Sequence, residues 1–397
     1  MQNEKTKVLR IIARLNVGGP VINSILLTTG LDKNRFESLL VTGIIGEGEG
    51  DMSYLAEQYG IKPIIIPELG REISWKSDLV ALWKLIRLFR KEKPDIIHTH
   101  TAKAGTLGRI AGILTGVPYK VHTFHGHVFN NYFGPFKTKV FIWIERILAR
   151  FTDRIIVISQ LQYDELCHEI RIAPPNKFSI ICLGFDLTEF LNSDVHHGKL
   201  RRELNISEDT LLVGIVGRLT AIKNHILFLK AAKKVSEKIA NVKFIVVGGG
   251  ELESEMKEVA VSLGIQDKVI FLGWRRDMPT IYADMDLVVL SSLNEGTPVT
   301  LIEAMASSKA VVSTAVGGVP DIVLDGQTGI LVPSGDEERF ADAIVDLLED
   351  AEKRKQFGEL GCEFVSVNYT KERLCADIER LYRIFFICHD SIPLDFV

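Results

Sequence analysis

Short apolar runs alternate with longer amphipathic segments along nearly the whole chain, and this alternation constrains the fold more than any other feature. Apolar runs of this kind are typical of strands that are buried on both faces of a parallel sheet. In the first half the expected strands are Val8–Leu15, Leu39–Gly43, Pro63–Ile66, Ile96–His100, Lys120–Thr123 and Arg154–Ser159. In the second half they are Leu211–Gly217, Lys243–Val247, Val269–Leu272, Leu287–Leu290, Ala310–Ser313 and Ile330–Val332. The pattern predicts an α/β fold built from βαβ units.

Segments with helical periodicity lie between these runs. The expected helices of the first half are Val21–Gly30, Asp78–Lys91, Gly105–Leu114 and Lys137–Arg150. Those of the second half are Ile226–Ile239, Leu252–Leu263, Leu301–Ser307 and Glu337–Glu349. A last helix is expected from Lys371 to Cys388, with apolar residues on one face.

The length of 397 residues suits two or three domains. Each half contains a strand that leads into glycines and then a helix, at Asn16–Pro20 and at Gly248–Leu252, and the boundary is expected within Phe185–Glu208. Two α/β domains of this kind form a cleft, where ligands commonly bind.

Composition excludes several classes of protein. An apolar fraction of 46% with 25% charged residues excludes intrinsic disorder, and five scattered cysteines without a C-x-x-C pair argue against a disulfide framework. No apolar run reaches about 18 residues, and the first residues lack the apolar core of a signal peptide. We therefore expect a cytoplasmic protein.

The net charge of −4 divides unevenly along the sequence. Residues 1–190 carry 24 Lys and Arg against 19 Asp and Glu, whereas residues 191–397 carry 23 against 32. The basic half could meet an anionic surface, and chance variation between two solvated surfaces explains the split equally well.

The first glycine turn, Gly18-Gly19-Pro20, follows the first expected strand. Glycines allow backbone amides to approach an anion, and a following helix adds the positive end of its dipole. The sequence is not G-x-G-x-x-G, so a phosphate contact and a simple tight turn remain equally good interpretations.

Five histidines follow two neighbouring strands: His98, His100, His122, His125 and His127. Clustered imidazoles can hold zinc, but no Asp or Glu stands beside them to orient the rings. We expect one of them to contact the reaction centre, the others to be structural, and no metal.

Two motifs in the second half combine charge with a loop at the end of a strand. Arg218 and Lys223 follow the strand Leu211–Gly217 and could bind a diphosphate, although most such residues are merely solvated. Glu295 lies in a glycine-containing loop, and Glu303 lies eight positions later in a helix whose first amides suit phosphate oxygens. A carboxylate that complements the helix dipole would explain Glu303 but not Glu295.

Together these motifs resemble the retaining glycosyltransferases of family 4, which have the GT-B architecture of two Rossmann-like domains with parallel sheets facing across a cleft. The resemblance covers almost the whole chain and also includes Val316–Asp321, Asp325–Gly329 and Gly248–Gly250. It implies domains at residues 1–190 and 191–370, with a helix in 371–397 that returns to the first domain.

The resemblance also implies roles for particular residues. Arg218 and Lys223 would bind the donor diphosphate, Glu295 the sugar hydroxyls and Glu303 the ribose, and His125 would face the donor sugar. Further donor-binding positions would be Gly18, Gly19, Gly249, Leu272, Gly273, Trp274, Thr297, Pro298, Val299, Thr300 and Leu301. Many relatives have an aromatic residue where this chain has Thr297, so sugar selectivity cannot be transferred.

The expected activity is transfer of a sugar from a nucleotide-sugar, a UDP-sugar by preference, to a glycan or lipid-linked glycan of a surface polysaccharide. Fixed cations would stabilise the leaving diphosphate without a metal or cofactor. The basic aromatic segments Trp83–Lys91 and Phe136–Ile144 could contact an anionic membrane at its inner face or pack in the core. No nucleic acid is expected. The alternatives are a transferase with a small soluble acceptor, a GT-B-like sugar-nucleotide epimerase, a dinucleotide oxidoreductase and a nonenzymatic sugar-nucleotide binder.

Overall fold

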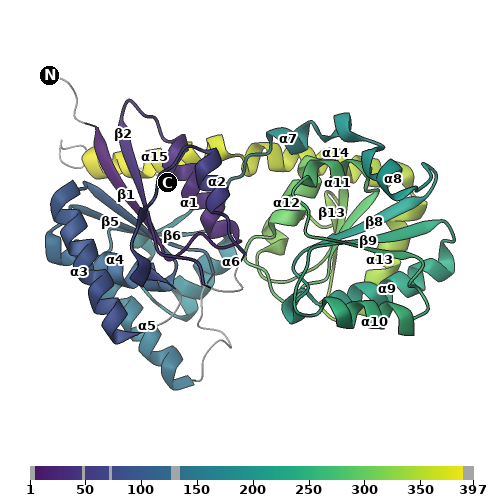
Figure 1. Ribbon diagram of the computed structural model, residues 1–397, viewed down its shortest axis with the longest axis horizontal. Coiled ribbons are helices and arrows are strands. Elements are labelled where there is room, and N and C mark those ends of the chain that lie inside the picture. Colours follow the sequence, from purple (N-terminus) through teal and green to yellow (C-terminus); the bar gives the residue numbers. More distant parts are fainter. Residues whose placement is uncertain (1–4, 47–49, 71–73, 127–134, 388–397) are drawn as a thin grey trace. The chain divides into compact units, whose positions relative to one another are not determined.

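The computed structural model describes residues 5–46, 50–70, 74–126 and 135–387 (Figure 1). The chain divides into two compact units: unit 1 is Met1–Phe185 with Lys371–Val397, and unit 2 is Asp186–Thr370. The domain boundary expected at residue 190 lies a few residues after the observed division.

In the described part of unit 1, seven parallel strands form one sheet in the order β3-β2-β1-β4-β5-β6-β7. Their bounds are β1 Thr6–Ile12, β2 Phe36–Thr42, β3 Ile64–Ile65, β4 Ile96–His100, β5 Tyr119–Phe124, β6 Arg154–Val157 and β7 Phe178–Ile180. The helices are α1 Gly19–Gly30, α2 Ser53–Gln58, α3 Trp75–Glu92, α4 Ala102–Thr115, α5 Pro135–Arg150, α6 Gln160–Tyr163 and α15 Lys371–Ile387, and a π-helix spans Asp164–Glu169.

Alternate residues of β1 show how both faces of this sheet are covered. Val8 packs with α1 and α15, whereas its neighbour Leu9 packs on the other face with residues of α3 and α4. Because successive side chains of a strand point to opposite faces, a strand buried on both faces must be apolar throughout. The last helix, α15, therefore completes the core of unit 1 through Leu374, Ile378 and Tyr382, as the returning helix was expected to do (Figure 1).

In unit 2, six parallel strands follow the order β10-β9-β8-β11-β12-β13. Their bounds are β8 Leu211–Val216, β9 Val242–Val247, β10 Val269–Gly273, β11 Leu287–Leu290, β12 Ala310–Thr314 and β13 Gly329–Val332. The helices are α7 Thr188–Leu191, α8 Lys199–Leu204, α9 His225–Lys238, α10 Glu253–Ser262, α11 Met278–Asp284, α12 Val299–Ala306, α13 Glu337–Glu349 and α14 Ala351–Asn368. Two Rossmann-like units with parallel sheets are what the sequence predicted.

Some elements were not anticipated. β7, α2, α11 and α14 have no counterpart among the expected elements. α14 has few buried residues and so lacks a clear apolar stripe in the sequence. β1 ends at Ile12 instead of Leu15, because residues 13–18 form the approach to the glycine turn.

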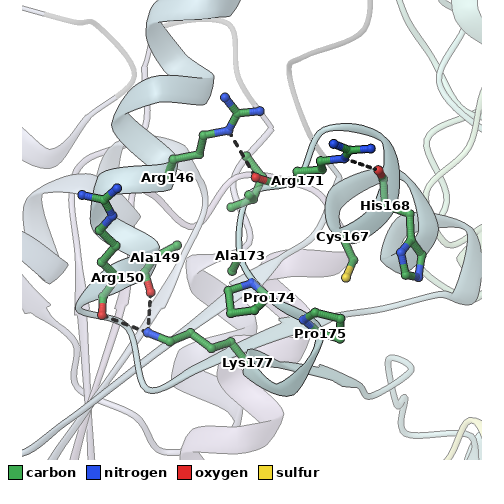
Figure 2. Close-up of a pocket in the computed structure, with 11 residues that line it drawn as sticks. Arg146, Ala149, Arg150, Cys167, His168, Arg171, Ala173, Pro174, Pro175 and Lys177 are labelled. Atoms are coloured by element: carbon green, nitrogen blue, oxygen red, sulfur yellow. Dashed lines mark hydrogen bonds between the residues drawn. The ribbon is translucent and has the colours of Figure 1, made fainter.

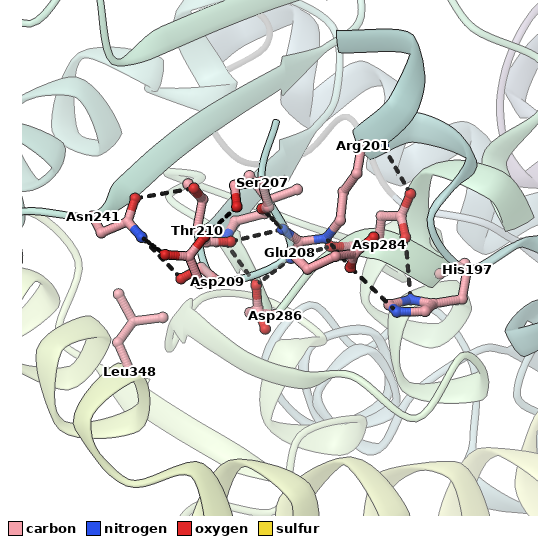
Figure 3. Close-up of polar contacts among 12 residues, drawn as sticks. His197, Arg201, Ser207, Glu208, Asp209, Thr210, Asn241, Asp284, Asp286 and Leu348 are labelled. Carbon is pink, nitrogen blue, oxygen red and sulfur yellow. Dashed lines mark hydrogen bonds and ion pairs between the residues drawn. The ribbon is translucent and has the colours of Figure 1, made fainter. Parts of the chain in front are cut away.

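A buried ion network holds the amino-terminal edge of the unit 2 sheet (Figure 3). Arg201 of α8 is only 4% exposed, and its guanidinium donates to the carbonyls of Ser207 and Thr210 at 2.8 Å and to Asp286 at 3.0 Å. The Asp284 carboxylate in turn accepts from the Arg201 amide at 3.0 Å. A buried charge is tolerated when it is paired and hydrogen-bonded, and both Nη atoms of Arg201 have acceptors, so this edge is occupied by structural contacts. The predicted donor-binding residues of unit 2 lie at the opposite edge of its sheet.

Candidate functional site

Two glycine-rich loops lock together after β8 and β9 of unit 2. Gly248 has a φ of +128°, and a Cβ there would collide with the Gly217 carbonyl oxygen. The Gly217 amide donates to Val247 at 2.9 Å, and the Gly248 amide donates to the Gly273 carbonyl at 2.8 Å. Glycine is therefore required for the close backbone approach that places Arg218 at the carboxyl edge of the sheet.

A second pair of loops meets after β11 and β12. Gly317 has a φ of +52°, and a Cβ there would collide with the carbonyl oxygen of Glu295. The Gly318 amide donates to that same oxygen at 3.0 Å. The glycine motif at Val316–Asp321 thus fixes the backbone of Glu295.

Lys223 and Glu295 form an ion pair. The Lys223 Nζ lies 2.5 Å from Glu295 Oε1, and the Ser292 hydroxyl donates to the same oxygen at 2.5 Å. The loop of Lys223 is itself held, because the Leu293 amide donates to the Ile222 carbonyl at 2.8 Å. The carboxylate is 9% exposed and the ammonium group belongs to a side chain that is 24% exposed, so the pair is partly shielded from water.

Arg218 is exposed and differs from Lys223 in its contacts. Within the part of unit 2 that the structure describes, its side chain makes neither an ion pair nor a hydrogen bond. Its planar guanidinium therefore remains available to an anion.

Glu303 lies on α12 and accepts a hydrogen bond from the Tyr282 hydroxyl at 3.1 Å. Tyr282 is fully buried on α11. Loss of hydration raises the pKa of Glu303 to about 7, and the Tyr282 hydrogen bond offsets only part of that rise. The carboxyl group therefore changes charge near neutral pH.

The first turn of α12 follows Pro298 and contains Val299, Thr300 and Leu301, two residues earlier than the sequence predicted. The first amides of a helix have no partner within the helix, and the dipole makes this end positive. These amides suit phosphate or sugar oxygens, and Thr297 and Pro298 lead into them from the Glu295 loop.

The remaining predicted positions of unit 2 cluster at the end of β10. Leu272 and Gly273 end the strand, and Trp274 follows with 64% of its surface exposed. A Cβ on Gly249 would lie 2.6 Å from Trp274 Nε1, so the indole rests directly on this glycine. An exposed indole provides a face on which a planar base can stack.

In unit 1, Gly18 immediately precedes α1 and Gly19 is its first residue. Pro20 is the second helical residue, so α1 begins two residues before the expected Val21. The Val21 amide donates to the Gly18 carbonyl at 3.1 Å, which closes the turn.

His125 lies in unit 1 just after β5. Its Nε2 is 2.8 Å from His100 Nδ1, and its own Nδ1 is buried without a partner. Burial lowers the pKa of His125 to about 3, so the imidazole is neutral at physiological pH. His98 differs, because Tyr382 and Thr123 satisfy both of its ring nitrogens at 2.7 and 2.6 Å.

His122 is bonded to Thr99 at 2.9 Å, whereas His127 lies outside the described residues. Among the residues that the structure places, no group of His, Cys, Asp and Glu has the arrangement of a metal site. Metal-free catalysis stays a prediction.

Comparisons with known proteins agree with this architecture. The family model described as "Glycosyltransferase Family 4" matches residues 17–189, and that described as "Glycosyl transferases group 1" matches residues 197–363. The chain is 34% identical over 294 residues to the UDP-Gal:alpha-D-GlcNAc-diphosphoundecaprenol alpha-1,3-galactosyltransferase of Escherichia coli, covering 73% of this chain and 76% of that protein. It is 31% identical over 329 residues to the capsular polysaccharide biosynthesis glycosyltransferase CapM of Staphylococcus aureus, covering 81% and 84%.

Solved structures show the same fold. HepE of Anabaena in complex with UDP and glucose has a TM-score of 0.79 at 22% identity, covering 95% of this chain and 99% of that one. Sucrose-phosphate synthase of Thermosynechococcus elongatus has a TM-score of 0.78 at 21% identity, covering 97% and 100%.

The fold and the family matches together define a glycosyltransferase with the two Rossmann-like domains of the GT-B class. The chain belongs to glycosyltransferase family 4. Within the described residues, no helix is both long enough and apolar enough to span a bilayer.

Two contacts were not anticipated from the sequence. Ser292 is three residues before Glu295 in the same loop, so its proximity could have been noticed. Tyr282 lies on a helix that the sequence did not predict, 21 residues before Glu303, and no local pattern connects the two.

Proposed function

We propose that this protein transfers a sugar from a UDP-sugar to a lipid-linked glycan acceptor during surface polysaccharide biosynthesis, with retention of anomeric configuration and without a metal. The observation that carries the proposal is the grouping of Arg218, the Lys223–Glu295 pair and the first turn of α12 at one edge of the unit 2 sheet.

The chemistry follows from charge. When the bond between the anomeric carbon and the diphosphate oxygen breaks, the diphosphate keeps the electron pair and the sugar becomes electron-poor. Arg218, Lys223 and the amides of α12 would stabilise the departing negative charge without reorganising. The acceptor oxygen then bonds to the anomeric carbon, and its proton passes to the departing diphosphate. These fixed positive groups remove the need for a bound cation.

Three other residues would position the donor. Glu295 would accept from sugar hydroxyls, Glu303 would accept from the ribose hydroxyls, and Trp274 would flank the base. Unit 1 would contribute His125 as a neutral hydrogen-bonding group toward the sugar, and Gly18 and Gly19 toward phosphate or acceptor. Retention is implied by the family. Glu295 is not assigned as a covalent nucleophile, because the sequence places no second carboxylate about 5 Å from it, as a double displacement needs.

The choice of donor and acceptor is supported by the relatives. The name of the Escherichia coli relative specifies UDP-galactose and a diphosphoundecaprenol-linked acceptor, and the Anabaena structure contains UDP.

Exposed aromatic side chains support a membrane-proximal acceptor. Phe136 and Trp143 of α5 are 80% and 63% exposed, and Trp75 and Trp83 of α3 are 71% and 56% exposed. The alternative, that these helices bury an apolar face in the core, also holds for part of each segment, since Leu85 and Phe89 are buried and Phe141 packs against a core cluster. Basic helices with exposed aromatic residues suit the interface of an anionic bilayer.

The test has two steps. Thermal stabilisation by a panel of sugar nucleotides should select a uridine-containing donor. Transfer is then measured to a diphosphate-linked GlcNAc lipid and to free GlcNAc. Stabilisation by another nucleotide class, or efficient transfer only to the free sugar, would refute the corresponding part of the proposal.

A further inference from the structure

One face of α5 carries a stripe of exposed aromatic and basic side chains. Phe136, Lys139, Trp143, Arg146 and Arg150 are spaced at i, i+3, i+7, i+10 and i+14, which places them along one side of the helix. Each is exposed to solvent. The stripe ends at the last turn of α5, next to β6.

A basic pocket lies where this stripe ends. It has a volume of about 850 Å³ and is bounded by the last turns of α5, the π-helix and residues 171–177 (Figure 2). Arg146, Arg150, Arg171 and Lys177 line it, and none of the described residues that line it is acidic. Because residue 150 ends α5 just before β6 begins, the pocket is at the amino-terminal edge of the sheet, whereas His125 follows the carboxyl end of β5.

The four cations are not equivalent. Lys177 donates to the carbonyls of Ala149, Arg150 and Thr152 at 2.8–2.9 Å, so it caps the end of α5. Arg146 donates through Nε and Nη2 to the carbonyls of Arg171 and Ile170 at 3.2 and 2.6 Å. These hydrogen bonds leave the Lys177 ammonium and the Arg146 guanidinium with fewer N–H donors for a ligand.

Arg150 and Arg171 keep more of their donors. Arg171 uses only Nε, which donates to the His168 carbonyl at 3.3 Å, and the Arg150 side chain has no hydrogen bond or ion pair among the described residues. Figure 2 shows Arg150 leaving α5 on one side of the pocket and Arg171 on the other. Two guanidinium groups with open donors that line one pocket suit an anionic phosphate group.

The wall that carries Arg171 has an unusual backbone. Arg171 has a φ of +57°, which is uncommon for a residue other than glycine, asparagine or aspartate. It follows directly after the π-helix Asp164–Glu169, a conformation that is rare and frequent at functional sites. Strained backbone of this kind is concentrated where a side chain must be held toward a ligand.

The other side of α5 is apolar. Ile113, Leu114, Ile147 and Phe151 line a groove of about 290 Å³ between α4 and α5, and Leu114 and Phe151 are 60% and 52% exposed. A basic pocket and an apolar groove thus flank the same helix, beside exposed Trp143. This combination matches the boundary between lipid headgroups and acyl chains.

We propose that the pocket between α5 and the π-helix binds the headgroup phosphate of an anionic membrane lipid through Arg150 and Arg171, while the groove between α4 and α5 contacts the acyl region. The inference rests on the proposed membrane-proximal function of unit 1. It adds a defined lipid site, separate from the donor-binding residues.

Vesicle sedimentation tests the site. Wild-type protein is mixed with phosphatidylcholine vesicles with and without phosphatidylglycerol, alongside the double variant Arg150→Gln/Arg171→Asn. Asparagine tolerates the backbone conformation at residue 171. The matched control is Arg339→Gln/Lys355→Gln, which removes two exposed positive charges from unit 2.

We expect binding only to the anionic vesicles, and roughly a fivefold loss of affinity for each pocket arginine removed, with the control unchanged. Equal binding by the double variant and the control overturns the pocket assignment and leaves membrane contact standing. If the wild type does not bind anionic vesicles at low salt, both the pocket assignment and the proposed membrane contact are overturned. Inorganic phosphate that raises the Tm of the wild type but not of the double variant, without vesicle binding, would assign the pocket to a soluble phosphate and overturn the lipid source.

UDP binding in solution is measured on the same samples. It should be unchanged in the double variant. The pocket is at the amino-terminal edge of the unit 1 sheet, whereas the proposed donor residues of unit 1, Gly18, Gly19 and His125, follow the carboxyl ends of β1 and β5, and the others are in unit 2. If the wild type does not bind UDP, the proposed transferase reaction is refuted and the pocket assignment is unaffected.

Discussion

Lys223 and Glu295 neutralise each other: the lysine Nζ lies 2.5 Å from the glutamate Oε1. The family resemblance implies separate roles for them: Lys223 would bind the diphosphate and Glu295 the sugar. In the structure they form one unit, anchored by the Ser292 hydroxyl and by the Gly318 amide. A donor must therefore share or displace this pair, while Arg218 is open to the diphosphate from the start.

Glu295→Gln should spare or modestly increase affinity for UDP, because the amide leaves the Lys223 charge without its carboxylate partner. Transfer should fall about tenfold or more, since an accepted sugar hydrogen bond to a charged group is weakened. Glu303→Gln should instead weaken UDP itself. Calorimetry with UDP alone and steady-state transfer rates distinguish the two residues. Equal losses of UDP affinity in both variants would contradict this division.

Arg218→Ala should lose roughly 10- to 150-fold in UDP affinity, as expected for the loss of a charge-assisted contact of about 1.5–3 kcal/mol. Because Arg218 is exposed and has no side-chain partner in the described residues, its removal should leave the Tm unchanged. Arg339→Ala is the control, because the Arg339 side chain of unit 2 is 70% exposed. Unaltered UDP affinity in a folded Arg218→Ala protein would exclude it from the donor site.

The pKa of about 7 at Glu303 predicts pH dependence with a definite sign. A carboxyl whose pKa is raised on folding contributes stability that is complete below its unfolded pKa, near 4.5, and is lost as pH rises through about 7. Ribose hydroxyls bind the charged form, so affinity for uridine should increase over the same rise in pH. The titration uses uridine instead of UDP, because uridine has no phosphate group that would itself titrate near pH 6–7.

Glu303→Gln provides the control for this effect. Both the fall in unfolding free energy between pH 5 and 8 and the rise in uridine affinity should be smaller in the variant. The quantities are measured by urea unfolding and by calorimetry. Identical pH profiles for wild type and variant would show that Glu303 is not the titrating group.

Gly317→Ala should lower both the Tm and the transfer rate, because the new Cβ would collide with the carbonyl oxygen of Glu295. Gly326→Ala separates this collision from backbone strain. Gly326 has a φ of +72°, close to the left-handed conformation of Gly317, but a Cβ there meets nothing within 4 Å. We expect about 1 kcal/mol of destabilisation at Gly326 and more at Gly317. Similar effects on transfer at both positions would argue against a direct link between Gly317 and Glu295.

Transfer should persist in the presence of a strong chelator. In the proposed reaction, Arg218, Lys223 and the amides of α12 would supply the positive charge that a divalent ion supplies elsewhere. Rates are compared in EDTA and in added Mg²⁺ or Mn²⁺, with a metal-dependent transferase as the positive control. Abolition by EDTA followed by rescue with one ion would overturn the metal-free mechanism.

The sequence by itself determined the class of fold. Strands such as Ile96–His100 and Leu287–Leu290 were predicted with their observed bounds, because continuous apolar runs bounded by turns leave little alternative to buried parallel strands. The strand that leads into glycines and then a helix at Gly248–Leu252 was also recognised from the sequence, and Gly248 makes a close backbone approach in the structure. Helices with little apolar periodicity, such as α14, were not predicted from the sequence.

Only the tertiary structure decided which of these side chains meet. Lys223 and Glu295 are 72 residues apart, and Tyr382 reaches His98 across 284 residues. Sequence periodicity reports the environment of a segment but not its partners, because partners are set by the order of strands in the sheet. Charge is governed in the same way: Glu303 and His125 titrate far from their ordinary values because surrounding elements exclude water from them, which no local pattern encodes.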